Sequence, residues 1–175
     1  VMRGLGTIRQ DVNVSIKEGE RIEIKGAQDL KMLPKLVESE ILRQQNLIEI
    51  KNELEKRKAE KNSKNKIIDL TKLLTNTKCK FIAEAVKKES KVYGIKLNKF
   101  NELLKKEKSA NQRLGYKFST FSKLLGFGGV IHSDEDLNKY NFSENEIKEI
   151  KKELNIKELD AFVMCVGDEN KLKIL

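Results

Sequence analysis

Charged and hydrogen-bonding side chains recur at every second position in two short stretches near the start of the chain. In chain order these residues are Arg9, Asp11, Asn13, Ser15, Arg21, Glu23 and Lys25. Guanidinium and ammonium groups bind phosphate oxygens through charge-assisted hydrogen bonds, and carboxylates bind Mg²⁺, which prefers hard oxygen ligands. Asn13 and Ser15 could orient a substrate. The pattern therefore suits a site for phosphate and metal, although a ladder of ion pairs across two solvated strands would have the same spacing.

The residues between these polar positions predict the element that carries them. They are apolar apart from Gln10, and comprise Ile8, Val12, Val14, Ile16, Ile22 and Ile24. A short turn containing Gly19 separates the two runs. Strict alternation on both sides of such a turn predicts an antiparallel β-hairpin that is buried on one side. The polar residues would then share its other face.

A long helix is predicted after the hairpin. Pro34, the only proline, suits the first turn of a helix because its missing N–H would be unpaired there. The apolar positions with helical spacing are Leu36, Val37, Ile41, Leu42, Leu47, Ile48 and Leu54, and the polar positions assigned to the other side are Glu38, Glu40, Arg43, Gln44 and Gln45. The apolar stripe stops near Glu53. The Lys-rich stretch 56–66 is expected to be a solvated connector and a domain boundary.

The rest of the chain alternates between strand and helix patterns. We predict a short strand or turn at 67–70, strands at 91–97 and 130–132, and a central strand within the apolar run 160–167. Helices are predicted over 77–88, after Asn111 up to a glycine cap at Gly126, and after a capping box formed by Ser143 and Glu146. Strands and helices in about 110 residues indicate a small α/β or α+β domain.

Composition limits the classes of function. The chain has 175 residues and a formal net charge of +9, which favours a polyanionic partner such as nucleic acid, although a lysine-rich composition explains the charge equally well. No apolar run could span a membrane and no signal peptide is visible. Cys79 and Cys165 are far apart and lack metal-ligand spacing, so a reducing cytoplasm is expected. Both ends of the sequence read as cut, which suggests a fragment of a longer protein.

Other candidate sites are weaker than the hairpin. Gly4 and Gly6 lack the context of a dinucleotide fingerprint. His132 is the only histidine, and its neighbours in sequence do not make a triad or a metal site, so we expect a structural or surface role. The aromatic residues Tyr93, Tyr116 and Phe118 are expected in the core rather than as base-stacking platforms, although a strand-borne Tyr93 would suit either role.

Two sets of residues resemble a known family. Residues 3–15, the run Arg21–Gly26 and the helix up to Gln44 resemble the cradle domain of the B/E subunits of tRNA-dependent amidotransferases. The motif Arg9-Gln10-Asp11 followed by Glu23-Ile24-Lys25-Gly26 resembles the archaeal E-type branch of that family more than the B-type branch. A second set of residues resembles the insertion (GAD) domain that this branch shares with bacterial-type aspartyl-tRNA synthetases. That set comprises 92–97, 112–115, 128–135 and 160–163.

The resemblance implies a fold and a division into domains. The fold class is α+β: a β-hairpin and long helix from a truncated cradle domain, followed by a small mixed α/β insertion (GAD) domain. The expected boundaries are 1–55 for the cradle part, 56–66 for the connector and 67–175 for the insertion domain. The sequence departs from the family at 136–138, where Asp-Leu-Asn replaces the usual Leu-Pro.

The resemblance also implies a function. The complete enzyme converts Glu-tRNA(Gln) to Gln-tRNA(Gln): it phosphorylates the glutamyl side chain with ATP and Mg²⁺, then replaces phosphate by ammonia from an asparaginase-like glutaminase partner, the D-type subunit. Carried over by position, the catalytic residues are Arg9, Asp11, Glu23 and Lys25. Asp11 and Glu23 would serve magnesium, Arg9 and Lys25 would bind phosphate, and Asn13 and Ser15 would bind substrate. No residue is assigned to tRNA(Gln).

The family also places essential parts outside this sequence. Its first cradle strands carry acidic and histidine residues for the metal, and its helical and tail domains follow later. We therefore expect the isolated chain to be inactive. The alternatives are a non-catalytic tRNA-, RNA- or protein-binding module, and a basic structural protein with no site. In aspartyl-tRNA synthetases, class II catalytic motifs flank the insertion domain. This chain has the predicted hairpin there instead, which favours the amidotransferase over a synthetase-type module.

Overall fold

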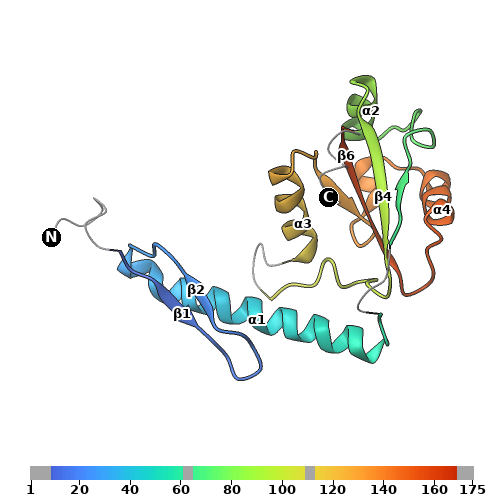
Figure 1. Ribbon diagram of the computed structural model, residues 1–175. Coiled ribbons are helices and arrows are strands. Elements are labelled where there is room, and N and C mark those ends of the chain that lie inside the picture. Colours follow the sequence, from blue (N-terminus) through green and yellow to red (C-terminus); the bar gives the residue numbers. More distant parts are fainter. Residues whose placement is uncertain (1–8, 61–64, 109–112, 169–175) are drawn as a thin grey trace. The chain divides into compact units, whose positions relative to one another are not determined.

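The computed structural model describes residues 9–60, 65–108 and 113–168. The chain folds into two compact units (Figure 1). Among the described residues, the first unit contains 9–55 with Glu107 and Lys108, and the second contains 56–60, 65–106 and 113–168. Residues 56–60, the described start of the Lys-rich stretch, thus group with the second unit. Ile8, the Gly4/Gly6 pair and the C-terminal residues 169–175 lie outside the described residues.

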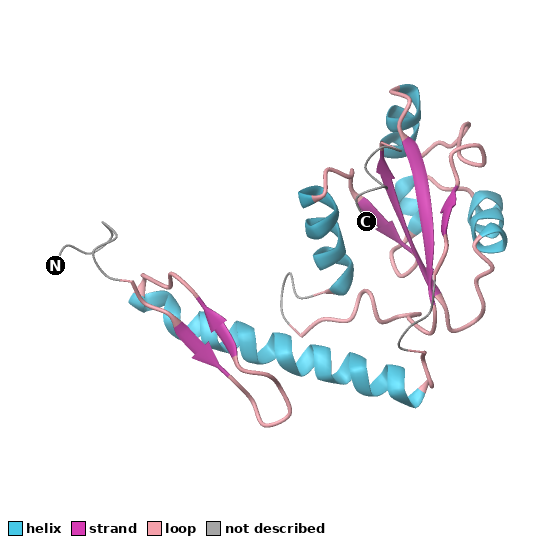
Figure 2. Cartoon of the chain, viewed as in Figure 1, coloured by secondary structure: helices cyan, strands magenta, loops and turns pink. Residues whose placement is uncertain are grey.

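The first unit is a hairpin beside a long helix (Figure 2). Strands β1 (Val12–Val14) and β2 (Ile22–Ile24) are antiparallel, with Val12 opposite Ile24 and Val14 opposite Ile22. A short 3-10 helix, η1 (Leu30–Met32), leads into α1 (Leu33–Lys56). The predicted hairpin is confirmed, with shorter strands than the alternation suggested, and Pro34 lies in the first turn of α1 as predicted.

The prediction for the two sides of α1 was wrong at three positions, although Glu38 and Gln45 are exposed as predicted. Glu40 and Gln44, assigned to the solvated side, are 8% and 5% exposed, whereas Leu47 on the expected apolar side is 37% exposed. A two-stranded ribbon is narrow and covers only part of a 24-residue helix. Periodicity identifies the polar and apolar sides of a helix, but it does not say on which side the neighbouring element packs.

The second unit is built on a four-stranded antiparallel sheet with the order β3-β4-β6-β5. Its strands are β3 (Ile67–Asp69), β4 (Lys91–Leu97), β5 (Val130–His132) and β6 (Ala161–Gly167). Its helices are α2 (Lys80–Lys87), α3 (Leu114–Leu124), the 3-10 helix η2 (Leu137–Tyr140) and α4 (Glu144–Glu153). The predicted α+β class is confirmed, and β6 is a central strand as predicted.

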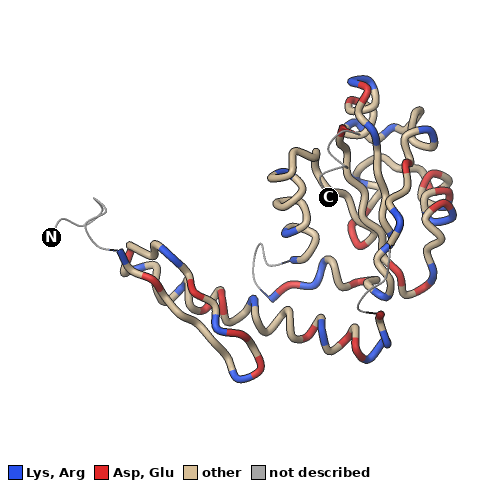
Figure 3. Tube along the Cα trace, in the orientation of Figure 1, with Lys and Arg blue, Asp and Glu red and all other residues tan. Residues whose placement is uncertain are grey.

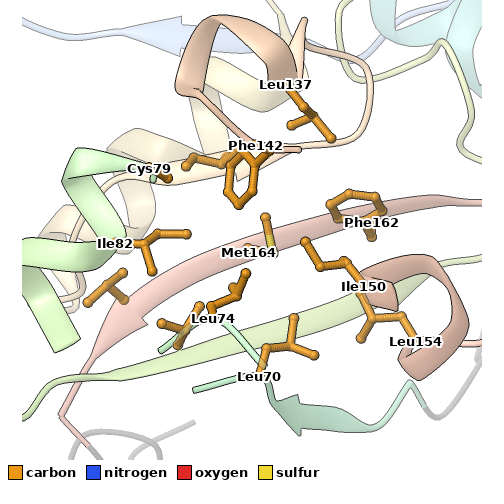
Figure 4. Packing of buried hydrophobic residues seen from close by; sticks show 13 residues of the cluster. Leu70, Leu74, Cys79, Ile82, Leu137, Phe142, Ile150, Leu154, Phe162 and Met164 are labelled. Atoms are coloured by element: carbon orange, nitrogen blue, oxygen red, sulfur yellow. The ribbon is translucent and has the colours of Figure 1, made fainter. Parts of the chain in front are cut away.

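Pairing in this sheet separates two apolar faces. Val92 pairs with Val166, and Gly94 with Met164, on the face that packs against Ile82 of α2 and Ile150 of α4 (Figure 4). The intervening residues of β4 and β6 belong to the other face, where Ile95 and Val163 pack with Leu114 and Phe118 of α3. The main core of the described chain therefore lies on the α2/α4 side of the sheet.

Local signals at the helix ends behave as predicted. The Ser143 hydroxyl accepts a hydrogen bond from the Glu146 N–H, while the Glu146 carboxylate accepts one from the Ser143 N–H. Gly126 has a φ of 78°, the left-handed conformation that favours glycine after a last helical turn.

Tyr93 and His132 are buried, but Tyr116 is 47% exposed, so its predicted core position was wrong. It lies on the side of α3 that the sheet does not cover.

Cys79 and Cys165 are free thiols. Burial raises the pKa of the Cys165 thiol above its ordinary value. Within the described ranges, no helix is both long enough and apolar enough to cross a membrane.

Candidate functional site

The hairpin presents its predicted polar residues on one open face. Asn13 lies directly opposite Glu23, and Val14, the next residue of β1, is 5% exposed on the opposite face. Because side chains alternate along a strand, Asp11, Asn13 and Ser15 share a face with Glu23 and Lys25. The structure therefore brings these sequence-predicted site residues together, and shows two short contacts among them.

Asp11 is the most engaged residue of this face. Its Oδ1 accepts a hydrogen bond of 3.2 Å from the Gly26 N–H, and its Oδ2 lies 3.4 Å from Nε of Arg9. Gly26 has a φ of 75°, which suits glycine. The hydrogen bond from Gly26 holds the pKa of Asp11 below its ordinary value, with further lowering by Arg9 and Lys25. Asp11 is therefore an ionised group that orients Arg9.

The second contact joins Lys25 and Glu23, whose Nζ and Oε2 atoms are 3.4 Å apart. Each ion pair thus joins two residues of the same arm, two positions apart, and neither pair crosses the hairpin as the ion pairs of a ladder would. The Arg9 and Lys25 side chains are 71% and 63% exposed, so such pairs add little stability. Both cations remain accessible to an incoming anion.

The described residues do not by themselves supply a cluster of metal ligands. They contain no group of three or more His, Cys, Asp or Glu side chains that could hold a metal ion. Asp11 and Glu23 supply two carboxylates, and each already pairs with a cation. The hairpin face is therefore at most one wall of such a site.

Sequence reasoning missed the network beneath this face. Arg43 donates two hydrogen bonds of 2.7 Å to the buried Glu40 carboxylate, which also accepts one of 3.0 Å from Gln44. Gln44 Nε2 lies 3.4 Å from the Val14 carbonyl oxygen. Hydrogen bonding to Glu40 raises the pKa of Arg43. The spacing Glu40-x-x-Arg43-Gln44 was the available signal, because residues three and four apart meet on a helix.

Charge elsewhere is distributed rather than confined to one element. Figure 3 shows basic and acidic residues interspersed along both units. The net charge of +9 alone therefore does not locate a nucleic-acid surface, and individual lysine clusters must be judged by their contacts.

Comparison with known proteins identifies the family. Residues 2–113 match the GatB/GatE catalytic domain, and the chain belongs to this family. The match contains the hairpin, α1 and the first part of the second unit, and it ends just before α3.

Individual relatives narrow the comparison to one type of subunit. The chain is 45% identical over 174 residues to the E subunit of glutamyl-tRNA(Gln) amidotransferase from Methanocaldococcus jannaschii, and 47% identical over 174 residues to the same subunit from Pyrococcus abyssi. These alignments cover 98% and 99% of this chain but 27% of each relative. The chain thus spans about a quarter of the length of the curated relatives it matches, and its predicted resemblance to the archaeal E-type branch is confirmed.

Proposed function

We propose that this chain is part of an ATP-dependent amidotransferase that converts Glu-tRNA(Gln) to Gln-tRNA(Gln). The observation that carries the proposal is its similarity, over nearly its whole length, to subunits named for that reaction. A carboxylate is a poor acceptor of ammonia, and an acyl phosphate supplies the leaving group that the reaction needs. A protein performing this chemistry must hold phosphate groups and an acyl group side by side.

The open hairpin face is the part of this chain that would contribute to such a site. Arg9 and Lys25 would bind phosphate oxygens, since both cations are exposed. Asn13 and Ser15 would hydrogen-bond the substrate. Of the two proposed magnesium ligands, Glu23 has the more exposed side chain, at 48%. The main role of Asp11 would be to position Arg9.

The remaining parts of the proposed reaction would come from elsewhere. ATP and Mg²⁺ would bind only where further residues complete the hairpin face. Ammonia would be supplied by an asparaginase-like D-type partner, and tRNA(Gln) would carry the glutamyl group. We therefore expect the 175-residue chain to have no amidotransferase activity by itself.

A chimera tests the proposal directly. The aligned 174-residue region of the M. jannaschii E-type protein is replaced by this chain, and the product is assembled with its M. jannaschii partner. We expect ATP-dependent formation of Gln-tRNA(Gln) from Glu-tRNA(Gln). Because removing one preorganised charge at a reacting centre typically costs about 10²–10³ in rate, Arg9→Ala and Lys25→Ala should each lower it by that order.

Two readouts separate the parts of the proposal. Glu-tRNA-dependent ATP hydrolysis reports activation of the glutamyl group, and amide formation reports the whole reaction. A folded chimera that binds tRNA but performs neither step would contradict the catalytic proposal and favour a non-catalytic RNA-binding module. Lys17→Gln, in the exposed turn of the same hairpin, is the charge-matched control and should leave both rates unchanged.

A further inference from the structure

Four lysines surround one cavity in the second unit. The cavity has a volume of about 310 Å³, and its lining includes Lys58, Lys96, Lys99 and Lys157 together with Asn98 and Asp160. Lys96 lies near the end of β4, whereas the other three lysines come from separate loops. We call this feature the lysine cavity. Sequence spacing gave no sign of it, because its members are up to about a hundred positions apart.

A buried carboxylate organises the lysine cavity. Asp160 is 7% exposed, and its two oxygens accept hydrogen bonds of 3.0 Å from the Lys99 N–H and 3.1 Å from the Lys157 N–H. Nζ of Lys96 lies 3.9 Å from the same carboxylate. Asp160 therefore ties three of the four lysines to one point, through the backbone of two and the side chain of the third.

The backbone around the cavity is held from the other side as well. Arg57 donates hydrogen bonds of 2.8 Å and 2.9 Å to the carbonyl oxygens of Lys99 and Asn101. Lys58 and Lys99 have φ values of 55° and 64°, a conformation that side-chain-bearing residues rarely adopt. Such conformations persist where the surroundings over-determine them, and they cluster at functional sites. The loops that carry these lysines are therefore constrained rather than loosely solvated.

The charge of the lining is only partly compensated. Asp160 pairs with Lys96, whose Nζ also donates to the Asn155 carbonyl. No described carboxylate forms an ion pair with Nζ of Lys58, Lys99 or Lys157. Glu60 also lines the cavity and is exposed, so lysines outnumber carboxylates there two to one. Three accessible ammonium groups around one hollow call for an anionic ligand.

The shape of the surface favours a polymer over a single small anion. A neighbouring cavity of about 370 Å³ shares Lys96, Asn98 and Glu60 with the lysine cavity, and its lining adds Lys66 and Glu153. The two hollows thus form a path longer than one phosphate group. Lysine is a compact point charge that contacts phosphates without reading bases.

We propose that the lysine cavity binds the phosphate backbone of RNA, with Lys58, Lys99 and Lys157 as the contacting cations and Asp160 as a positioning residue. Choosing RNA as the occupant rests on the proposed function, in which a tRNA is the substrate. Contacts to phosphates position the RNA but do not read its sequence. Selection of tRNA(Gln) over other tRNAs would therefore depend on other residues.

Matched triple variants of the 175-residue chain test this proposal. Binding of a tRNA(Gln) transcript is measured by fluorescence anisotropy at several salt concentrations between about 50 and 200 mM. Lys58→Gln/Lys99→Gln/Lys157→Gln should weaken binding at least tenfold, and should lower the magnitude of the salt slope by about 2, since each lost phosphate contact removes about 0.7–0.9. The arginine triple variant keeps the charges and should restore binding.

The control changes the same charge at the other end of the sheet. Lys80→Gln/Lys87→Gln/Lys88→Gln alters exposed lysines of α2 and its C-terminal end, which precede the first residue of β4. The lysine cavity instead lies at the last residues of β4 and the loops beside them. This control should change affinity by less than twofold. Equal losses in the two glutamine variants would mean non-specific attraction and would overturn the proposal.

Two further outcomes separate this inference from the proposed function. If the chain binds inorganic tripolyphosphate through the three lysines but not tRNA, the RNA occupant is wrong whatever the chimera does. If the chimera is inactive while tRNA binding still depends on the three lysines, the amidotransferase proposal fails and the RNA contact stands. Circular dichroism of each variant confirms that it is folded.

Discussion

Gly115 of α3 lies against the imidazole ring of His132 at the end of β5, so closely that a Cβ atom on residue 115 would be 2.1 Å from Nε2 of the histidine. Backbone hydrogen bonds next to this contact join α3 to the loop that contains Leu104. The Gly115 N–H donates to the Leu104 carbonyl at 3.0 Å, and the Leu104 N–H donates to Asp134 at 2.8 Å. The His132–Glu135 stretch, part of the family resemblance, therefore joins α3 and the 98–104 loop to the sheet.

We expect Gly115→Ala to destabilise the second unit. Alanine is normally better than glycine inside a helix by up to about 1 kcal/mol, but here its methyl group would collide with a buried ring. Overpacking of this kind typically costs about 1–3 kcal/mol. Urea denaturation measures the change in the free energy of unfolding.

Gly129→Ala is the matched control for this substitution. A Cβ at position 129 would lie 3.5 Å from its nearest neighbour, Phe81, which is ordinary van der Waals contact. This change should be close to neutral. A Gly115→Ala protein as stable as the original would show that α3 can shift away from His132.

Stability should fall as the pH drops below 6.5. Burial lowers the pKa of His132 below its ordinary value of 6.5, despite an opposing effect of Glu135 and Asp134, and Arg113 lowers it further. The unfolded chain therefore takes up a proton near pH 6.5, whereas the folded chain does so only at lower pH. The stabilisation is complete above pH 6.5 and is lost as the pH falls through the folded pKa, by at most about 1.4 kcal/mol per pH unit.

Because His132 is the only histidine, its titration can be followed by NMR without ambiguity. We expect a midpoint below 6.5 in the folded chain and near 6.5 in the presence of denaturant. His132→Gln should flatten the pH dependence of stability between about pH 7 and 5. A folded-state midpoint above 6.5 would mean that the carboxylates of Glu135 and Asp134 outweigh burial.

Asp11→Asn should impair the chimeric enzyme without unfolding the hairpin. Asparagine keeps an oxygen that can accept the Gly26 hydrogen bond, but it loses the charge that orients Arg9. We expect Glu-tRNA-dependent ATP hydrolysis to fall by about 10²–10³, with an unchanged thermal midpoint. Normal hydrolysis in the variant would show that the Asp11–Arg9 pair is only a surface contact.

Breaking the Glu40–Arg43 pair should loosen the hairpin from α1. Glu40→Ala removes the acceptor shared by Arg43 and Gln44, and leaving such partly buried donors unpaired costs about 1–3 kcal/mol. Hydrogen exchange measured on peptides covering β1 and the middle of α1 reports this loss locally. Exchange in the second unit should not change.

A double variant distinguishes pairing from burial in this network. Glu40→Met/Arg43→Met replaces both charges by apolar side chains and should be less destabilising than Glu40→Ala, because no charged partner is left unpaired. If the double variant is the less stable of the two, then replacing the Arg43 side chain costs more than leaving it without its carboxylate partner.

Prediction from sequence succeeded where local rules act. The bounds expected for β4 and β5 match the structure residue for residue, and the capping box at Ser143 forms as expected. These features depend on alternation and on hydrogen bonds between residues three positions apart. Prediction from sequence failed for Glu40, Gln44 and Tyr116, because the burial of a helical residue depends on which neighbouring element lies beside it.

The amino-acid sequence alone determined the alternating hairpin, the gathering of its polar residues on one face, and the resemblance that the family comparison confirmed. Only the tertiary structure decided that the ion pairs run along each arm of the hairpin, that Asp11 is held by Gly26, and that Asp160 gathers Lys96, Lys99 and Lys157. The physical reason is range. Alternation is set by neighbouring residues, whereas Asp160 and Lys99 are 61 positions apart and meet only because β4 and β6 pair in the sheet.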